Sequence, residues 1–322
     1  MFAVRVHEVG GPEQLRYEEI PVPEPATGQV RVTVATVGLN YIDTYHRSGL
    51  YPLPLPFTPG SEIAGTIDGL GAGVEGWQVG DRVVTTVAIG GYAQQALVPA
   101  DKLVRVPEDV TFDLAAAVML QGMTAHYLTH STFALKSSDT CLIHAAAGGT
   151  GQLLCQLARR IGARVIGTTS TEEKGALARA AGANEIIFYN REPVAARVRE
   201  LTGGRGVDVV YDSVGASTWE GSLDSLRPRG MLVSFGNASG PVTNISPLIL
   251  SAKGSLFLTR PTLGHYTASP EELAWRAGDL LGWIGAGELD VRIDRRYPLA
   301  EAAAAHRALQ ARETAGKVLL IP

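Results

Sequence analysis

The sequence contains few of the residues that build disulfide-rich or metal-stapled proteins. Among its 322 residues only Cys141 and Cys155 are cysteines, too few for a disulfide framework or a structural zinc site with four thiolates. The opening segment MFAVRVHEVGG carries Arg5 and Glu8 within its first apolar stretch and lacks the pattern of a secretory signal. We therefore expect a protein of the reducing cytoplasm.

An excess of positive charge and a long apolar run are also missing. Lys and Arg number 28 against 32 Asp and Glu, a net charge of −4, so the charge balance would not attract nucleic-acid phosphates or anionic lipid. The apolar run from Leu114 to Leu120 is far shorter than the ~18 residues that a membrane span needs. Both features argue against nucleic acid as a partner and against a membrane location.

The residues that are present predict an α/β protein of about two domains. Before about Pro107, short strand-like runs separated by Gly and Pro indicate a β-rich domain. After Thr140, apolar runs alternate with helical segments, which is typical of a doubly wound parallel sheet. The C-terminal segment is too short for a further α/β domain. We predict one domain of residues 1–122 completed by 263–322, and a second of residues 123–262.

A glycine motif follows the first strand of the second domain. The strand Cys141 to His144 runs into AAAGGTG and then into QLLCQLARRIG, so that Ala146-x-Gly148-x-x-Gly151 opens a helix expected to begin at Gly151. Small residues allow close backbone approach, and a helix N-terminus favours an anion. Because strand, glycines and helix come in the required order, we expect a dinucleotide pyrophosphate here. A glycine turn without a ligand is the alternative.

The end of the following strand favours NADP over NAD. NAD sites usually carry an Asp or Glu there, about 20 residues beyond the glycines, whereas this sequence has Thr168 to Thr171, followed by Glu172, Glu173 and Lys174. Hydroxyls and a cation suit a 2′-phosphate, and a lysine in a first helical turn opposes the helix dipole unless an anion lies nearby. A solvated surface lysine is the alternative for Lys174.

These motifs resemble the zinc-free medium-chain dehydrogenases/reductases, specifically the NADPH-dependent quinone oxidoreductases of the zeta-crystallin type. The resemblance covers the whole chain and implies a GroES-like β-rich catalytic domain, a Rossmann domain that binds NADP(H), a quinone substrate, and a homodimer paired through the edge of the Rossmann sheet. Five segments carry it: SDTCLIHAAAGGTGQLLCQLAR (138–159), GLNYIDTYHRSGLYP (38–52), VYDSVG (210–215), LVSFGNASG (232–240) and LTRP (258–261).

The resemblance also implies the residues of the site. Residues of the segment 38–52 are expected to line the substrate cleft and to act in catalysis: Asn40, Asp43, Tyr45 and Tyr51. A larger set is expected to contact the cofactor: Tyr41, Ile42, Thr124, Tyr127, Gly148, Gly149, Thr150, Gly151, Ser170, Lys174, Tyr189, Asn237, Ala238, Arg260 and Arg312. Plain packing is the alternative for Tyr51, Thr124 and Tyr127, a surface position for Arg312, and a structural ion pair for Arg260.

The sequence departs from the alcohol dehydrogenase branch at the zinc ligands. That branch uses a Cys, a His followed by Glu, and a later Cys, whereas this chain has Asn40 or Asp43 near the first position, Ser61-Glu62 at the second, and no cysteine before Cys141. We expect no metal site. Alcohol oxidation without a Lewis acid is disfavoured, but a quinone spreads incoming charge over two oxygens, so positioning and modest hydrogen bonding from Tyr45 or Tyr51 can suffice.

Two other functions stay open at this point. A reductase of α,β-unsaturated carbonyls would use the same cofactor geometry but would need a proton donor beside the enolate. A non-enzymatic crystallin-like or RNA-binding protein belongs to a different class, and the acidic balance disfavours RNA.

Overall fold

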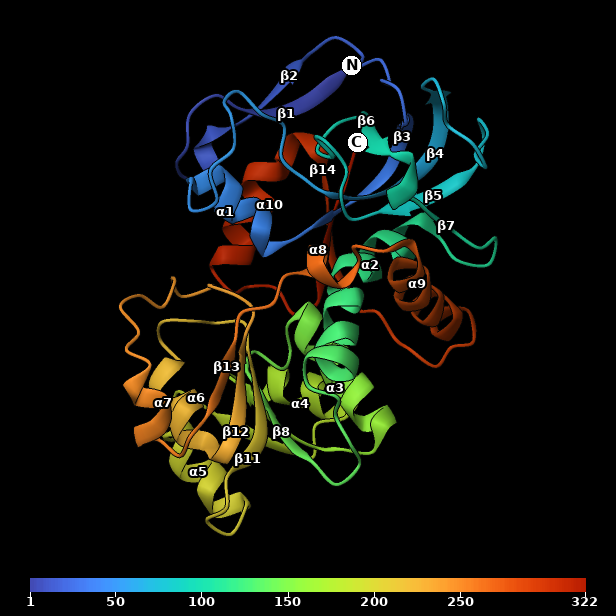
Figure 1. Ribbon diagram of the computed structural model, residues 1–322. Helices are drawn as coiled ribbons and strands as arrows, with labels where there is room; N and C mark the ends of the chain where they lie inside the picture. The colour runs from blue at the N-terminus through green and yellow to red at the C-terminus, as the bar shows by residue number, and fades with distance from the viewer. The chain divides into compact units, whose positions relative to one another are not determined.

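The computed structural model describes residues 1–322. The chain folds into two compact units, unit 1 from Met1–Leu120 and Ala268–Pro322, and unit 2 from Gln121–Thr267 (Figure 1). Each unit has its own sheet and its own hydrophobic core. The limits suggested by the sequence pattern, at 122 and 263, fall a few residues from these.

Unit 1 is built on a seven-stranded sheet of order β14-β15-β3-β4-β5-β7, with β6 also paired with β3. Its strands are β3 (Gln29–Leu39), β4 (Glu62–Leu70), β5 (Arg82–Thr85), β6 (Gln95–Pro99), β7 (Val104–Arg105), β14 (Ile293–Pro298) and β15 (Lys317–Ile321). The C-terminal strand β15 pairs antiparallel with β3, with Val318 opposite Leu39. This register brings Lys317 beside the residue that follows β3, Asn40.

The remaining elements of unit 1 surround this sheet. They are the two-stranded sheet β1 (Phe2–Val6) and β2 (Leu15–Glu19), the helices α1 (Tyr41–Ser48), α9 (Pro270–Gly285) and α10 (Ala302–Gln310), and the short 3₁₀ turns η1 (Pro12–Gln14), η2 (Ala100–Lys102) and η4 (Leu299–Glu301). The first helix begins where the backbone N–H of Asn40 donates to the Asp43 carboxylate at 2.9 Å, and it ends at Gly49, whose φ of 81° suits glycine.

Unit 2 is a six-stranded parallel sheet of order β10-β9-β8-β11-β12-β13, which confirms the expected doubly wound fold. Its strands are β8 (Thr140–Ile143), β9 (Arg164–Thr169), β10 (Glu185–Phe188), β11 (Val207–Asp212), β12 (Leu226–Ser234) and β13 (Phe257–Thr259). The strand order reverses between β8 and β11, and in such sheets ligands bind beyond the carboxyl ends of the strands at this point.

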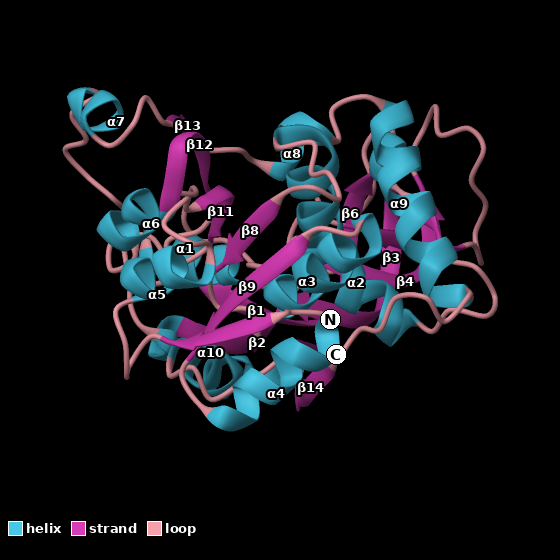
Figure 2. Cartoon of the chain, turned by 90° about the horizontal axis from the view of Figure 1, so that it is seen from below, coloured by secondary structure: helices cyan, strands magenta, loops and turns pink.

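Helices flank the sheet of unit 2. They are α3 (Gly149–Ile161), α4 (Glu172–Ala181), α5 (Val194–Leu201), α6 (Trp219–Ser225), α7 (Leu248–Ala252) and α8 (Leu263–Tyr266). Helices α3 and α4 pack together, as do α5 and α6, and Figure 2 shows these cyan helices beside the magenta strands. No helix of the chain has both the length and the apolar character needed to cross a bilayer.

Two boundaries differ from the expected ones. Helix α2 runs unbroken over Phe112–Tyr127, across the domain limit expected at residue 122, and is followed by a π-helical turn, η3 (Leu128–Thr132). One glycine inside a helix, here Gly122, costs only about 1 kcal/mol, and buried apolar residues on both sides of it, Met119 and Met123, offset that loss. Helix α3 starts at Gly149, earlier than the expected Gly151, because Gly148 takes the extended N-cap conformation.

Candidate functional site

The glycine loop of unit 2 forms a tight turn between β8 and α3. The turn closes with a bond of 2.8 Å from the Gly148 N–H to the Ala145 carbonyl. A Cβ on Gly151 would lie 2.2 Å from that same carbonyl oxygen, and one on Gly149 would lie 2.0 Å from the Gln121 side-chain oxygen. No side chain caps the helix, so the N–H groups of Gly149, Thr150 and Gly151 meet the requirement for binding a pyrophosphate.

The carboxyl ends of β9 and β10 bring together the residues expected at the adenosine phosphate. Ser170 follows β9, and the Tyr189 N–H donates to the Thr169 carbonyl at 3.2 Å from the next strand. The Thr171 hydroxyl caps α4 by accepting from the Lys174 N–H at 3.2 Å. Hydroxyl-bearing residues and a lysine therefore follow the end of β9, where an NAD site would carry a carboxylate.

Glu172, the first of the two acidic residues after Thr171, is paired with a cation. The Glu172 carboxylate lies 2.6 Å from the Arg191 guanidinium, and the Arg191 side chain in turn lies over the Phe188 ring at 4.7 Å. An exposed pair of this kind adds little stability, but it compensates one negative charge beside Lys174. The local charge is thus compatible with a bound phosphate.

Residues that follow β12 and β13 also meet at the carboxyl ends of the strands. An Arg260 guanidinium nitrogen donates to the Gly236 carbonyl at 3.3 Å, and the Ala238 N–H donates to the Ser213 carbonyl at 3.3 Å. The loop that carries Asn237 and Ala238 is thereby held by Arg260 and by the end of β11. The expected cofactor contact of Arg260 stays a prediction.

Thr124 and Tyr127 both lie on α2 within the interior of unit 2. Tyr127 is 2% exposed, and its ring stacks on that of Tyr266 with centroids 4.3 Å apart and planes 9° apart. Thr124 is buried as well. These contacts describe the packing of both residues inside unit 2. Their expected contact with the nicotinamide stays a prediction.

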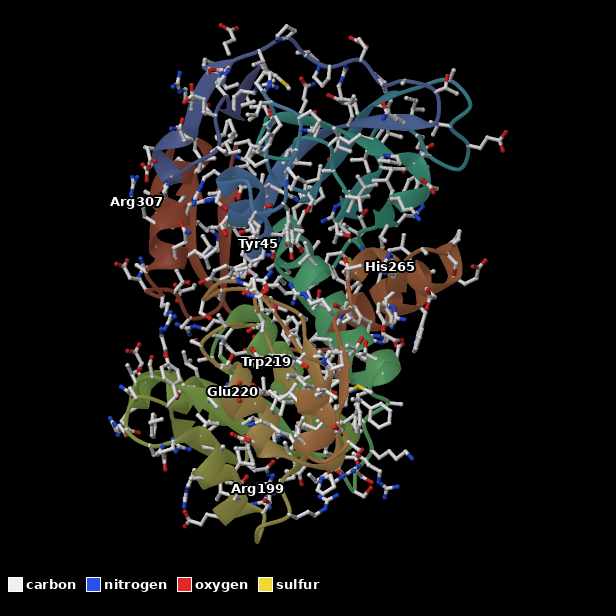
Figure 3. All side chains as sticks on the ribbon, turned by 60° about the vertical axis from the view of Figure 1, so that its left-hand side comes forward. Tyr45, Arg199, Trp219, Glu220, His265 and Arg307 are labelled. Carbon is white, nitrogen blue, oxygen red and sulfur yellow. The ribbon has the colours of Figure 1, made fainter.

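In unit 1, α1 and the loop after it carry a cluster of tyrosines. The ring centroids of Tyr41 and Tyr45 are 6.3 Å apart, and those of Tyr45 and Tyr51 are 5.3 Å apart in an edge-on arrangement; Figure 3 labels Tyr45 on α1. The Tyr41 hydroxyl donates to the Leu309 carbonyl at 3.2 Å. Burial raises the pKa of Tyr41, while the charge of Arg312 works in the opposite direction. Ile42 is partly buried on the same helix.

A buried ion pair lies beneath the start of α1. The Lys317 ammonium donates to the Glu62 carboxylate at 2.5 Å and to the Asn40 side-chain oxygen at 2.9 Å. The Asn40 amide donates to the same Glu62 oxygen at 2.7 Å, and the Leu120 N–H donates to its other oxygen. All three side chains are buried. Asn40 is therefore fixed by bonds to both members of the pair.

A second chain of bonds ties Asp43 to the other end of α1. The Tyr92 hydroxyl donates to Asp43 at 3.0 Å and its oxygen lies 3.0 Å from His306 Nε2, while the Arg47 guanidinium donates to His306 Nδ1 at 3.0 Å. Since burial disfavours charge, it raises the pKa of Asp43 to about 7 and lowers that of His306 to about 3.

Asn40 and Asp43 thus lie inside unit 1, where Asn40 is bound to Glu62 and Lys317 and Asp43 accepts its bonds through Oδ2, while its Oδ1 has no partner. Their expected contact with substrate stays a prediction. The sequence interpretation did not identify Lys317, Tyr92 or His306, and it considered Glu62 only as a replaced zinc-site residue. Lys317 had a detectable signal, because it is a lone charge at the start of the apolar strand KVLLI. Tyr92 and His306 had none, since only the tertiary fold brings them to α1.

The side chains that ligate metals are dispersed. No group of three or more His, Cys, Asp or Glu is arranged to hold a metal ion. Cys141 and Cys155 are free and buried, and burial raises the pKa of the Cys155 thiol to about 12. Cys155 is therefore a core residue of α3.

Two family models match the chain, one in each region. The alcohol dehydrogenase GroES-like domain matches residues 26–108, and the model described as zinc-binding dehydrogenase matches residues 149–274. The first match lies in unit 1 and confirms the GroES-like fold; the second covers the glycine loop and most of the parallel sheet.

Comparison with individual proteins extends these matches over nearly the full chain. The quinone oxidoreductase of Pseudomonas aeruginosa is 51% identical, with 97% of each chain covered, and the 2-haloacrylate reductase of a Burkholderia species is 45% identical, with 100% of this chain and 99% of the relative covered. The Escherichia coli quinone oxidoreductase solved in complex with NADPH superposes with a TM-score of 0.98 at 44% identity over 100% of both chains. As its motifs predicted, the chain belongs to the quinone oxidoreductase family of the medium-chain dehydrogenases/reductases.

Proposed function

We propose that this protein is an NADPH-dependent quinone oxidoreductase that works without zinc. The observation that carries the proposal lies at the carboxyl ends of the strands of unit 2. There an uncapped glycine turn follows β8, and the neighbouring strand ends are followed by Ser170, Lys174 and Tyr189 in place of an acid. The NADPH complex of the E. coli relative supports the same cofactor.

Unit 2 serves as the NADP-binding domain. The N–H groups of Gly149, Thr150 and Gly151 hold the pyrophosphate, which Gly148 allows to approach the backbone closely. Ser170 and Lys174 hold the 2′-phosphate with help from Tyr189 and Arg312. Thr124, Tyr127, Asn237, Ala238 and Arg260 complete the nicotinamide side. When bound, NADPH supplies the hydride that reduces the quinone.

Unit 1 serves as the catalytic domain. Tyr45 and Tyr51 contact the planar substrate, to which a tyrosine offers an apolar face and a polar tip, and either hydroxyl can hydrogen-bond a quinone oxygen. Tyr41 and Ile42 contact the cofactor. Asn40 and Asp43 contribute by fixing the start of α1, since their polar groups are held by Lys317, Glu62 and Tyr92.

A cofactor titration followed by a substrate panel tests the proposal. We expect NADPH to bind the purified protein more tightly than NADH, and naphthoquinones to be reduced faster than 2-alkenals with NADPH as reductant. A protein that binds neither reduced nicotinamide, or that turns over substrate only after zinc is added, would contradict it.

A second candidate function is the reduction of α,β-unsaturated carbonyls. The 45% identical 2-haloacrylate reductase favours it. Such a reaction needs a proton donor beside the enolate, and the hydroxyls of Tyr45 and Tyr51 are the candidates. Turnover of a 2-alkenal or a 2-haloacrylate equal to or above that of naphthoquinones would make this the main activity.

We further propose a cytoplasmic homodimer paired through β13. This strand is the edge of the unit 2 sheet, and an edge strand has backbone groups able to pair with a second copy. Phe257 on β13 is 56% exposed and Leu248 on α7 is 77% exposed. Phe257→Asp should convert the dimer to a monomer in light scattering; a wild-type monomer at micromolar concentration would refute the pairing.

A further inference from the structure

Four buried side chains of unit 2 meet at the carboxyl ends of three neighbouring strands. His144 follows β8, Thr168 lies near the end of β9, and Asp212 ends β11, strands that are adjacent in the order β9-β8-β11. Ser222 joins them from α6, the helix that Trp219 and Glu220 mark in Figure 3. All four side chains are buried, and none is among the residues expected to touch the cofactor.

Asp212 fixes the direction of every bond in this group. Its Oδ2 accepts from the Ser222 hydroxyl at 2.7 Å and from the Thr218 hydroxyl at 2.7 Å, while its Oδ1 accepts from the N–H groups of Val214 and Gly215. Because Ser222 gives its single proton to Asp212, its oxygen can only accept from His144 Nε2, 3.0 Å away. The proton of the imidazole is thereby placed on Nε2.

The other ring nitrogen of His144 is bound to Thr168 on β9. With its proton on Nε2, the neutral His144 ring has a free acceptor at Nδ1, so the Thr168 hydroxyl, 3.1 Å away, must donate to it. Burial lowers the pKa of His144, which favours the neutral ring that this arrangement requires. The chain therefore has one consistent set of donors and acceptors, running from Thr168 through His144 and Ser222 to Asp212.

This series of hydrogen bonds lies next to the start of the glycine turn. Ala145, the residue after His144, has a φ of 51°, a left-handed conformation that costs a residue with a side chain about 1–2 kcal/mol. The Ala146 N–H donates to the Thr168 carbonyl at 3.0 Å, and the Gly148 N–H returns to Ala145. Such strained backbone persists only where its surroundings hold it in place.

We propose that Thr168, His144, Ser222 and Asp212 are positioning residues for NADP(H). Their hydrogen bonds hold the strained turn at Ala145 and aim the N–H groups at the start of α3 toward the pyrophosphate. This inference rests on the proposed cofactor, and it assigns a task to residues that do not touch the ligand. They act through the turn, so their loss should weaken cofactor binding more than it slows the chemical step.

A matched control lies at the other end of the same strand. Asp208 is at the amino end of β11 and, like Asp212, is 2% exposed. It accepts from the Thr140 N–H at 2.8 Å and pairs with the guanidinium groups of Arg205 and Arg227. Asp208→Asn therefore disturbs a buried carboxylate of the same sheet, far along the strand from the glycine turn.

The experiment compares NADPH affinity with stability in five proteins: wild type, Ser222→Ala, Thr168→Val, Thr168→Ser and Asp208→Asn. Fluorescence titration gives the Kd for NADPH, steady-state reduction of a naphthoquinone gives kcat and the KM for NADPH, and thermal unfolding gives Tm. We expect Ser222→Ala and Thr168→Val to raise Kd and KM about tenfold, the effect of one well-placed hydrogen bond, while kcat at saturating NADPH changes less than about twofold.

Thr168→Ser keeps the hydroxyl and should bind NADPH like wild type. Asp208→Asn should lower Tm at least as much as Ser222→Ala yet leave Kd within about twofold of wild type. An equal loss of affinity in Asp208→Asn, or an unchanged Kd in folded Ser222→Ala and Thr168→Val, overturns the positioning role. If wild type itself binds no NADPH, the proposed function fails first, so the two failures are distinguishable.

Discussion

The two units bury polar side chains at equivalent points, where a strand leads into a functional helix, but they do so with different chemistry. In unit 1, Asn40 between β3 and α1 is held by the charged pair of Lys317 and Glu62. In unit 2, His144 between β8 and the glycine turn is held by hydroxyls, with Asp212 as the only charge. Removal of one group should therefore cost more stability in the charged network of unit 1 than in the mostly neutral network of unit 2.

The difference follows from what burial costs each kind of group. A buried ion pair adds little net stability while intact, but removal of one partner leaves a charge without compensation and costs about 3–5 kcal/mol. A lost hydrogen bond between neutral groups costs about 1 kcal/mol. Loss of one buried group should therefore destabilise the fold strongly in unit 1, whereas in unit 2 it should mainly disturb the geometry of the glycine turn.

The largest effect is expected at the buried pair of unit 1. Lys317→Met should lower the free energy of unfolding by about 3–5 kcal/mol, because Glu62 would be left charged and unpaired. Urea denaturation followed by circular dichroism measures this loss. Ser222→Ala in unit 2 should lower it by less, about 1.5–3 kcal/mol, because the Asp212 carboxylate loses one donor and keeps three others.

A double variant separates charge from packing in that experiment. Lys317→Met combined with Glu62→Gln removes both charges and should recover at least about half of the loss, since no uncompensated carboxylate remains. If Lys317→Met is no worse than Ser222→Ala, the contrast between the units is wrong. If the double variant is as unstable as Lys317→Met, packing of the lysine chain is responsible instead.

The next effect concerns a charge that serves a ligand rather than the fold. Lys174→Ala should weaken NADPH binding about 10- to 100-fold, the usual value of a charged hydrogen bond, and should leave NADH binding nearly unchanged. Titration with both coenzymes measures it. Lys136→Ala, at an exposed lysine of the same unit, is the matched control; equal weakening of both coenzymes by Lys174→Ala would refute the phosphate contact.

The sequence predicted unit 2 in more detail than unit 1 for a physical reason. In unit 2 the chemistry is local: β8, the glycines and α3 are consecutive, so Gly148 to Gly151 and the hydroxyls near Ser170 are readable from the order of residues. Even there, the start of α3 was misplaced by two residues, from Gly149 to Gly151, because an N-cap glycine looks like part of a loop.

In unit 1 the chemistry is assembled from distant segments. Lys317 reaches Asn40 only because β15 pairs with β3, and His306 reaches Tyr92 across most of the chain. No periodicity within a short window reports such contacts. The tyrosines of α1 were identified because they share one segment, whereas the groups that fix the helix required the fold.

A pH experiment sharpens the comparison within unit 1. Asp43 has a pKa of about 7, raised from 3.8, so its contribution to stability is present at low pH and is lost as pH rises through 7. His306 has a pKa of about 3, lowered from 6.5, so its contribution is present above 6.5 and is lost as pH falls toward 3. Between pH 4 and 6.5 the two slopes oppose each other.

Asp43→Asn removes one of these slopes. From pH 4 to 6.5 the stability of the variant should rise with pH more steeply than that of wild type, by about 1 kcal/mol per pH unit, because the contribution of His306 is no longer opposed. Urea midpoints measured at several pH values give both curves. Parallel curves would show that Asp43 titrates in the folded protein as it does in the unfolded chain.

The smallest effect is expected at the strained turn of unit 2. Ala145→Gly relieves a left-handed conformation at 51° but adds backbone entropy to the unfolded chain, so the two terms nearly cancel and stability should change by less than about 1 kcal/mol. NADPH affinity should fall a few-fold, since a freer turn is less preorganised. Ala147→Gly, at a buried neighbour outside the left-handed region, gains no strain relief and should destabilise by about 0.5–1 kcal/mol. If Ala145→Gly destabilises as much as Ala147→Gly, the turn stores no strain. The hydrogen bonds of His144 would then not be needed to keep Ala145 in the left-handed conformation.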